Sequence, residues 1–286
     1  MNVLSQLQLP KLPEPLPRPV VDNHTHLAST ERYSGLPVAD SLELAAAVGV
    51  TRVVEVGTDV ASSRAAIELA ERYPSVVAAV AIHPNDAGRL AQAGELDEHL
   101  AQLAELVPHP QVRAVGETGL DYYRTRDADA QAAQAISFAA HIEWAKRHDR
   151  TLVIHDRDAH ADVLRVLDEQ GAPQRVVMHC FSGDADFARE CSSRGYWLSY
   201  PGVVTFGNAG SLREAAQATP LERILVETDA PYLTPAPERG KANAPYLVPH
   251  TTRFLADLLG VDLVEFCDQV TANTDQAYAG SWATHG

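Results

Sequence analysis

The chain has 286 residues, a formal net charge of −15, 45% hydrophobic residues and 21% charged residues. This composition is typical of a globular protein with a large core, and the acidic charge argues against a broad basic face for nucleic acid. We predict a cytoplasmic protein without membrane contact: the three cysteines show no pairing framework, no apolar run approaches the roughly 20 residues that span a bilayer, and no leader pattern is seen. The oligomeric state stays open, with a monomer as the expectation.

The first 19 residues contain five prolines: Pro10, Pro13, Pro15, Pro17 and Pro19. Proline fixes φ and lacks a backbone donor, so we expect residues 1–19 to form an extended arm that lies on the body or is loose. No break in composition follows, and residues 20–286 are therefore predicted to form one domain.

From Val20 onward, apolar runs rich in β-branched residues alternate with amphipathic stretches rich in Ala, Leu, Glu and Arg. The strand-like runs are 20–27, 52–57, 76–83, 112–120, 151–155, 175–180, 196–204 and 224–228. The helix-like stretches are 38–48, 61–73, 96–107, 128–148, 159–170, 184–194, 208–218, 249–259 and 263–278. Strands that are apolar on both faces and alternate with helices indicate a parallel sheet covered by helices.

Eight such strands predict closure into a single-domain (β/α)8 TIM barrel, an α/β fold. An open doubly wound sheet is the competing architecture, and it would need a glycine-rich phosphate loop after the first strand. That position holds Asp22-Asn23-His24-Thr25-His26 instead. The sequence therefore favours the barrel.

Metal-binding side chains recur where the predicted strands end, which is the end of such a barrel that carries the active site. His24 and His26 point to one face of the first strand, because residues i and i+2 do so. The candidates on later strands are His83, Glu117, His155, His179, Glu227 and Asp229. Buried imidazoles and carboxylates are costly unless they are paired or bind metal, so two cations in the mouth explain the set.

The first cation is assigned to His24, His26, Glu117 and Asp229, and the second to Glu117, His155 and His179. Glu117 is the expected bridge, because it comes from the middle of the ligand order. A carboxylate must serve, since none of the three lysines lies at a strand end where a modified lysine could bridge. The expected cofactors are two divalent metal ions, Mg²⁺, Mn²⁺ or Zn²⁺. Their identity stays open, because histidine with carboxylate suits Fe²⁺ and Ni²⁺ as well.

Three further side chains are expected to bind substrate. His83 is placed at the mouth, where it could hold a phosphate oxygen; a structural histidine is the alternative. Arg124 and Arg157 are candidate phosphate clamps, since guanidinium forks match phosphate, and surface salt bridges are the alternative for both.

The remaining polar residues are assigned roles outside metal and substrate binding. Glu227 either orients its neighbours or faces solvent as an ordinary strand-end glutamate. Cys180 follows His179 directly, and alternation along a strand assigns it to core packing. The histidines on predicted helices and turns, with one in the C-terminal tail, are assigned to solvated positions: His99, His109, His141, His148, His160 and His285.

The motifs occur in a fixed order along the chain: Asp22–His26, Ala81–Pro84, Gly116–Tyr122, Ile154–Arg157, Met178–Gly183, Glu227–Leu233 and Asn243–Pro245. They resemble the TatD family of metal-dependent deoxyribonucleases in the amidohydrolase-like group of barrels, and the likeness covers roughly Val21 to Tyr278. The resemblance implies a hydrolase that cleaves DNA phosphodiester bonds with divalent metal, as a 3′–5′ exonuclease acting on single strands or 3′ ends.

The expected mechanism uses hydroxide from a metal-activated water, which attacks phosphorus in line. Asp229 accepts the proton and Glu117 bridges the ions, and these two are the predicted catalytic residues. The alternative is a small-molecule amide or lactone hydrolase of the same fold, because a polarised carbonyl and a polarised phosphoryl need similar chemistry. A non-catalytic barrel would carry a broken ligand set, and this set is complete.

Overall fold

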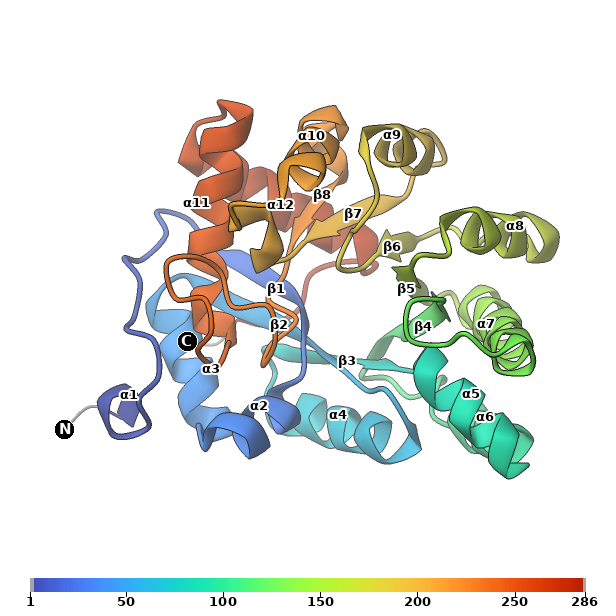
Figure 1. Ribbon diagram of the computed structural model, residues 1–286. Coiled ribbons are helices and arrows are strands. Elements are labelled where there is room, and N and C mark those ends of the chain that lie inside the picture. Colours follow the sequence, from blue (N-terminus) through green and yellow to red (C-terminus); the bar gives the residue numbers. More distant parts are fainter. Residues whose placement is uncertain (1–2, 285–286) are drawn as a thin grey trace.

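The computed structural model describes residues 3–284. Met1, Asn2, His285 and Gly286 lie outside the described residues. The prediction for His285, the start of the predicted arm and the end of the predicted domain fall on these residues. Eight parallel strands form one sheet in sequence order, and helices surround it (Figure 1). The strands are β1 (Val20–Thr25), β2 (Val50–Val56), β3 (Val76–Val80), β4 (Val112–Asp121), β5 (Thr151–Arg157), β6 (Val176–Met178), β7 (Trp197–Tyr200) and β8 (Ile224–Val226). The predicted (β/α)8 barrel is confirmed.

Backbone contacts between β1 and the segment after β8 close the barrel. Thr25 pairs with Ala230 in a parallel bridge. The Asp229 amide donates to the His24 carbonyl at 3.0 Å, and the His26 amide donates to the Ala230 carbonyl at 3.0 Å. Closure therefore brings the first and last predicted ligand segments together by main-chain hydrogen bonds.

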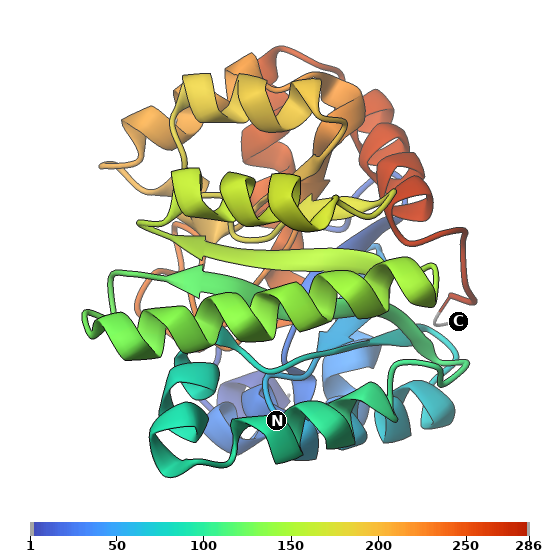
Figure 2. The same cartoon turned by 90° about the vertical axis from the view of Figure 1, so that its right-hand side faces the viewer.

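The helices are α1 (Val3–Gln6), α2 (Leu27–Ser34), α3 (Val38–Ala47), α4 (Val60–Arg72), α5 (Pro84–Ala93), α6 (Leu96–Ala104), α7 (Ala128–Arg147), α8 (His160–Gln170), α9 (Ala185–Ser193), α10 (Gly210–Ala218), α11 (Val248–Leu259) and α12 (Leu263–Ala277), with 3-10 turns η1 (Gly202–Thr205), η2 (Leu221–Arg223) and η3 (Pro245–Leu247). Figure 2 shows the green to yellow helices α7, α8 and α9 side by side along one flank. Aspartates cap α4, α7, α9 and α12 by accepting backbone amides, which satisfies donors that a helix start leaves free.

The arm predicted to be extended contains the short helix α1, and several predicted strands end early, for example β3 at Val80 instead of residue 83. Three further departures follow the carboxyl ends of strands: two helices and one strand end. The periodicity did not predict α2 or α5, which begin directly after His26 and His83 and carry short apolar faces. The strand expected over 196–204 ends at Tyr200, because Pro201 follows and the chain turns into η1. All three departures lie beside the barrel mouth, where the chain is shaped by the site as well as by the core.

Apolar side chains fill the barrel interior as well as the layer between sheet and helices. The end opposite the mouth is closed by the segment after α12. Tyr278 is fully buried, and its hydroxyl donates to the Asn23 carbonyl at 3.0 Å. Trp282 donates from Nε1 to the Ser75 carbonyl, just before β3. The interior is thus a packed core, and access is left to the mouth.

The proline-rich segment lies on the body. Leu4 and Leu16 are buried, and the Leu16 amide donates to the Val48 carbonyl at 3.0 Å. The Tyr246 hydroxyl donates to the Pro10 carbonyl at 2.9 Å, which ties the segment to η3. Among residues 3–284, no helix is both long and apolar enough to cross a bilayer.

Candidate metal centre

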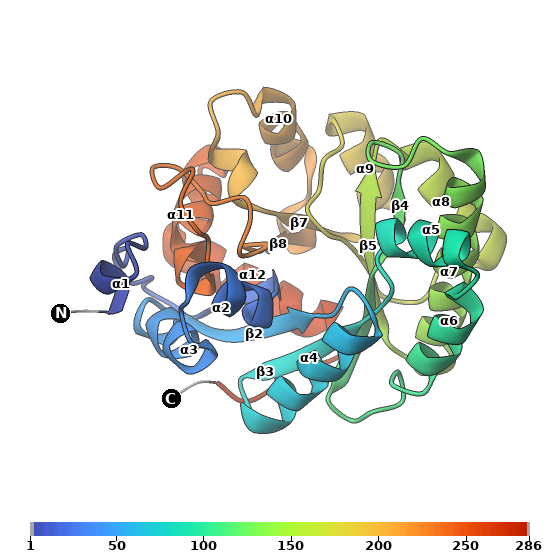
Figure 3. The same cartoon turned by 60° about the horizontal axis from the view of Figure 1, so that its bottom comes forward.

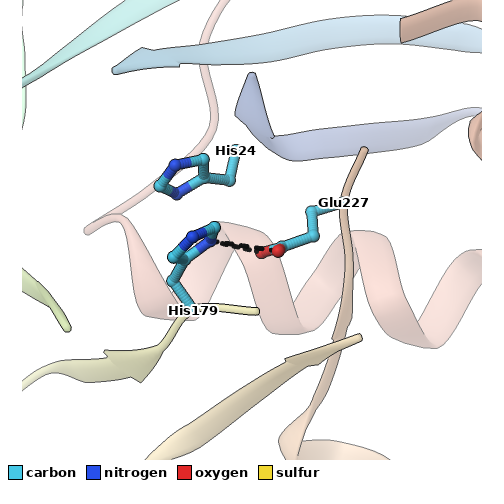
Figure 4. A group of neighbouring side chains, drawn as sticks. All are labelled: His24, His179 and Glu227. Atoms are coloured by element: carbon cyan, nitrogen blue, oxygen red, sulfur yellow. Dashed lines mark hydrogen bonds and ion pairs between the residues drawn. The ribbon is translucent and has the colours of Figure 1, made fainter. Parts of the chain in front are cut away.

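The first candidate ligand, His24 on β1, is completely buried. Within residues 3–284, neither of its ring nitrogens has a hydrogen-bond partner, and its ring lies 3.4 Å from the His179 ring, centroid to centroid (Figure 4). Its Nε2 lies 3.6 Å from Glu117 Oε2 and 3.9 Å from Asp229 Oδ1. A buried imidazole without a partner is costly, and a cation between these atoms would satisfy it.

His26 directly follows β1 and is held in a defined orientation. Its Nδ1 lies 2.8 Å from the Val56 carbonyl, which can only accept, so Nδ1 carries the proton. In the neutral ring, the lone pair of Nε2 then faces Asp229 Oδ1 at 3.4 Å and Glu117 Oε2 at 4.0 Å. A backbone carbonyl that fixes the tautomer in this way is common behind metal-binding histidines.

Glu117 lies on β4 at the centre of the cluster. The preceding Gly116 has φ +156°, and a Cβ there would lie 2.4 Å from the Val153 carbonyl oxygen; a Cβ on Gly119 would lie 2.1 Å from that of His155. Both glycines are required for β4 to approach β5 so closely. Glu117 Oε2 faces the two histidines of β1, whereas Oε1 lies 2.7 Å from His155 Nδ1 and 3.3 Å from His179 Nε2.

The separations between these atoms suit shared cations. Donor atoms bound to one tetrahedral ion at about 2.1 Å lie about 3.4 Å apart. The nitrogen-to-oxygen distances in the group His24, His26, Glu117 and Asp229 run from 3.4 to 4.0 Å. The six residues assigned to metal from the sequence therefore converge, and their donor chemistry fits divalent cations.

Buried carboxylates hold the two histidines of the second group. His179 Nδ1 lies 3.0 Å from Glu227 Oε1, and the Cys180 amide donates to the same oxygen at 3.0 Å (Figure 4). His155 Nε2 lies 3.1 Å from Asp121 Oδ2. Each histidine thus presents its other nitrogen to Glu117. Glu227 is fully buried, so it orients its neighbours, and the solvent-facing alternative is wrong.

Three positioning carboxylates were missed in the sequence: Asp22, Glu55 and Asp121. Asp22 is fully buried and accepts from Thr228 Oγ1 at 2.6 Å, which locks β1 to the segment of Asp229. Glu55 accepts from the Leu27 amide at 2.6 Å and so caps α2 just after His26. A carboxylate directly after two valines in a predicted strand was the available signal for Asp22 and Glu55.

The charges of the cluster depend on one another. Burial alone would raise the pKa of Glu117, but His83 and His179 hold it well below its usual range. Burial would lower the pKa of His26 and His155, yet their carboxylate partners raise each to about 9. For His24, burial and the neighbouring His179 lower the pKa. Since metal ligands must be deprotonated, a cation entering this set would displace protons.

His83, the first predicted substrate contact, lies inside the cluster but differs in its hydrogen bonding. Its Nδ1 accepts from the Asn85 amide at 3.1 Å at the start of α5. The neutral ring therefore carries its proton on Nε2, which lies 3.4 Å from Glu117 Oε1. His83 is thus arranged as a donor, unlike His26 and His179.

Arg124 lies on the segment after β4 and Arg157 is the last residue of β5, and both are exposed. Neither forms an ion pair within residues 3–284, so the surface salt bridges that were the alternative are absent there. The Arg157 guanidinium lies 4.6 Å from the centroid of the Tyr123 ring. Both cations remain free to meet a ligand.

Two sequence-based assignments are wrong. Cys180 has φ +44°, which breaks the strand alternation, and its sulfur lies within 4.8 Å of ligand atoms of His179 and Asp229. His141 is fully buried instead of solvated: Nδ1 lies 2.6 Å from the Ser137 carbonyl, and Nε2 accepts from the Ile82 amide at 3.0 Å. Burial lowers the pKa of His141 to about 4.

Comparisons with known proteins identify the family of the chain. The model of the family described as TatD related DNase matches residues 21–279. The uncharacterized metal-dependent hydrolase TatD of Mycobacterium tuberculosis is 46% identical over 92% of this chain and 99% of its own length. The uncharacterized metal-dependent hydrolase YabD of Bacillus subtilis is 38% identical over 90% and 98%.

Solved structures show the same architecture. The crystal structure of YJJV, a TatD homologue from Escherichia coli, matches with a TM-score of 0.80 and 25% identity over 92% of this chain and 98% of that one. A TatD family hydrolase from Entamoeba histolytica matches with a TM-score of 0.78 at 20% identity, which supports the fold alone.

Proposed function

The chain belongs to the TatD family and is a metal-dependent hydrolase, and from this premise we propose that it cleaves DNA phosphodiester bonds as a 3′–5′ exonuclease on single strands. In this proposal two divalent cations, Mg²⁺, Mn²⁺ or Zn²⁺, are held by His24, His26, Glu117, His155, His179 and Asp229. The substrate contacts are His83, Arg124 and Arg157.

One observation carries the two-cation proposal: the two oxygens of Glu117 face different sets of imidazoles. Oε2 lies near His24 and His26, and Oε1 lies near His155 and His179, with His83 on the same oxygen as a donor. A carboxylate placed in this way can serve two cations at once, one on each oxygen. The donor set, imidazole with carboxylate, suits the proposed ions.

Such ions, when bound, acidify a water and neutralise the charge of a phosphate group. The residues of the chain supply the remaining functions. Asp229 Oδ1 faces His24, His26 and His179 at 3.4 to 4.0 Å, so it borders the centre of the cluster. We assign it the proton of a water that bound metal would acidify there. The neighbouring imidazoles outweigh the effect of burial and lower the pKa of Asp229, which keeps the acceptor ionised at neutral pH.

His83 is assigned to a phosphate oxygen. Its Nε2 carries the proton and points to the centre of the site, so it can donate to an oxygen that gains charge during attack. Arg124 and Arg157 provide guanidinium forks at the rim, where phosphate oxygens of the strand would pass.

The small-molecule hydrolase is the rival, and the exposed aromatic side chains favour DNA over it. Tyr123 follows β4 and is 53% exposed; Tyr232 follows β8 and is 59% exposed. Both lie at the mouth end of the barrel. Exposed rings, of which Tyr123 lies beside Arg157, provide stacking platforms for the bases of a single strand, whereas a closed pocket would bury them.

The test is hydrolysis of 3′-labelled single-stranded DNA by metal-loaded protein, next to a panel of amides and lactones. Asp229→Ala and His155→Ala are each expected to abolish metal-dependent cleavage while the circular dichroism spectrum stays native. Arg147→Ala, on the exposed end of α7, is the control and should cleave normally. Unchanged turnover in either site variant would contradict the assignment, and turnover of the panel without DNA cleavage would favour the rival function.

A further inference from the structure

A hollow of about 240 Å³ lies beside the metal cluster, between α5 and the segment that joins β4 to α7. Arg89 of α5 and Arg124 and Arg126 of the joining segment line it, and we call it the arginine hollow. In Figure 3, α5 lies next to α7 at the rim of the barrel, and these helices are in contact. The hollow is smaller than the pockets that enclose a whole drug-sized ligand, which usually exceed about 300 Å³.

The lining is cationic in a strongly acidic protein. Its one carboxylate, Asp127, is engaged as the cap of α7, where it accepts from the Ala130 amide at 2.9 Å. Arg89 pairs with Asp86 at 2.9 Å. Within residues 3–284, Arg124 and Arg126 form no ion pair. Asp86 balances Arg89 and Asp127 balances one further arginine, so one guanidinium of the lining is left uncompensated. In a chain with a net charge of −15, this local positive charge favours an anionic ligand.

Hydrogen bonds connect the hollow to the metal cluster. Asn85, in its wall, donates from Nδ2 to Asp121 Oδ2 at 3.3 Å, and the same oxygen lies 3.1 Å from His155 Nε2. Thr125 donates to Asn85 Oδ1 at 3.4 Å, and the Arg124 amide donates to Asp121 Oδ1 at 2.8 Å. An anion in the hollow is therefore held at a fixed offset from the cluster.

We propose that the arginine hollow binds a second phosphate of the substrate, the next one toward the 5′ end from the phosphate that is cut. This inference rests on the proposed function and narrows its substrate class to strands with at least two phosphodiester groups. Guanidinium groups bind phosphate through paired hydrogen bonds, which suits a lining with several of them. An amide or lactone substrate would have no group to place there.

The test compares two strands in holoenzyme turnover. One is a short single-stranded DNA with natural phosphates, and the other carries an uncharged methylphosphonate at the position next to the scissile bond. The wild type should cleave the natural strand faster by about 10- to 100-fold, the effect of losing a hydrogen bond to a charged group. The double variant Arg89→Gln/Arg126→Gln should cleave both strands at the slower rate. Arg124 is left in place, because it also belongs to the proposed substrate contacts.

The chain offers a matched control in Arg189, which pairs with Asp186 three residues before it, as Arg89 does with Asp86, but lies on α9. Arg189→Gln should retain the preference for the natural strand. Thymidine 5′-(p-nitrophenyl phosphate), which has one phosphodiester and no second phosphate, should be hydrolysed equally by the wild type and the double variant. Equal cleavage of both strands by the wild type, or an unchanged preference in the double variant, overturns the inference.

A binding measurement separates this inference from the proposed function. If the wild type cleaves neither the strands nor the nitrophenyl ester, the proposed function fails. Fluorescence anisotropy with the natural strand then still tests whether the arginine hollow binds a phosphate. Each phosphate contact to a single strand adds about 0.7 to the slope of log K against log salt. The double variant should lower the slope by about that amount, and an unchanged slope or absent binding overturns the inference.

Discussion

Glu227→Gln tests whether the carboxylate behind His179 controls metal affinity. Glu227 is fully buried, and its Oε1 meets both His179 Nδ1 and the Cys180 amide at 3.0 Å. Glutamine has nearly the same shape but carries no charge. Its amide oxygen can accept from one of the two donors, and its NH₂ group then faces the other as a second donor.

The magnitude follows from these contacts. A hydrogen bond to a charged acceptor contributes about 1.5–3 kcal/mol, roughly twice a neutral one. The variant should therefore orient His179 less firmly and make it less basic. We expect the free energy of metal binding to become less favourable by about 1.4–2.7 kcal/mol. This range corresponds to a metal affinity that is lower by about 10- to 100-fold, the usual cost of removing a partner behind a metal-binding histidine.

The assay is a competition between metal-stripped protein and a chromophoric chelator for Zn²⁺ or Mn²⁺, which reports affinity without turnover. Glu222→Gln, an exposed glutamate in η2 just before β8, is the control and should bind metal as the wild type does. Wild-type affinity in Glu227→Gln, with a native circular dichroism spectrum, would refute the claim that Glu227 acts on metal through His179.

Two further changes test other parts of the site. His83→Asn keeps a side-chain acceptor at the start of α5 and withdraws the Nε2 donor, so kcat/KM for DNA should fall by about 10- to 100-fold while the metal content measured by atomic absorption stays constant; loss of metal would instead make His83 a ligand. His141 takes up a proton below the ordinary pKa of 6.5 in the unfolded chain, but only near pH 4 in the native chain. The contribution of the neutral, buried His141 to folding stability is therefore fully present above pH 6.5 and is lost as the pH falls toward 4. Urea unfolding at pH 7 and pH 4.5 should therefore show a loss of stability that is about 2–3 kcal/mol larger in the wild type than in His141→Gln, and equal losses would contradict a neutral buried His141.

The barrel and the ligand cluster were predictable from the sequence because both follow from periodic rules. Buried parallel strands are apolar on both faces, and the active-site end of such a barrel gathers the residues at the strand ends. His155 and His179 were found in this way although 24 residues separate them in the chain. The rule needs no distances, only the order of the elements.

The features that the sequence did not reveal depend on departures from that periodicity. Cys180 was assigned to the core because alternation was assumed, but its positive φ turns the sulfur toward the site. His141 was assigned to solvent because helical histidines are usually exposed, but α7 presents it to the Ile82 amide. Local conformation and the packing of one helix against a distant segment decide both positions, and neither is encoded in spacing.

Charge connects the acidic surface with a polyanionic substrate under the proposed function. A chain with a net charge of −15 repels the backbone of DNA over most of its surface, so long-range attraction cannot hold an extended duplex on it. The mouth can attract DNA, because the proposed cations, Arg157 and the arginine hollow bring positive charge together there. A strand end, which presents few phosphates and can enter the mouth alone, gains that attraction with the least repulsion. The charge distribution therefore favours cleavage from an end over cleavage within a strand, and it gives a physical reason for the proposed exonuclease mode.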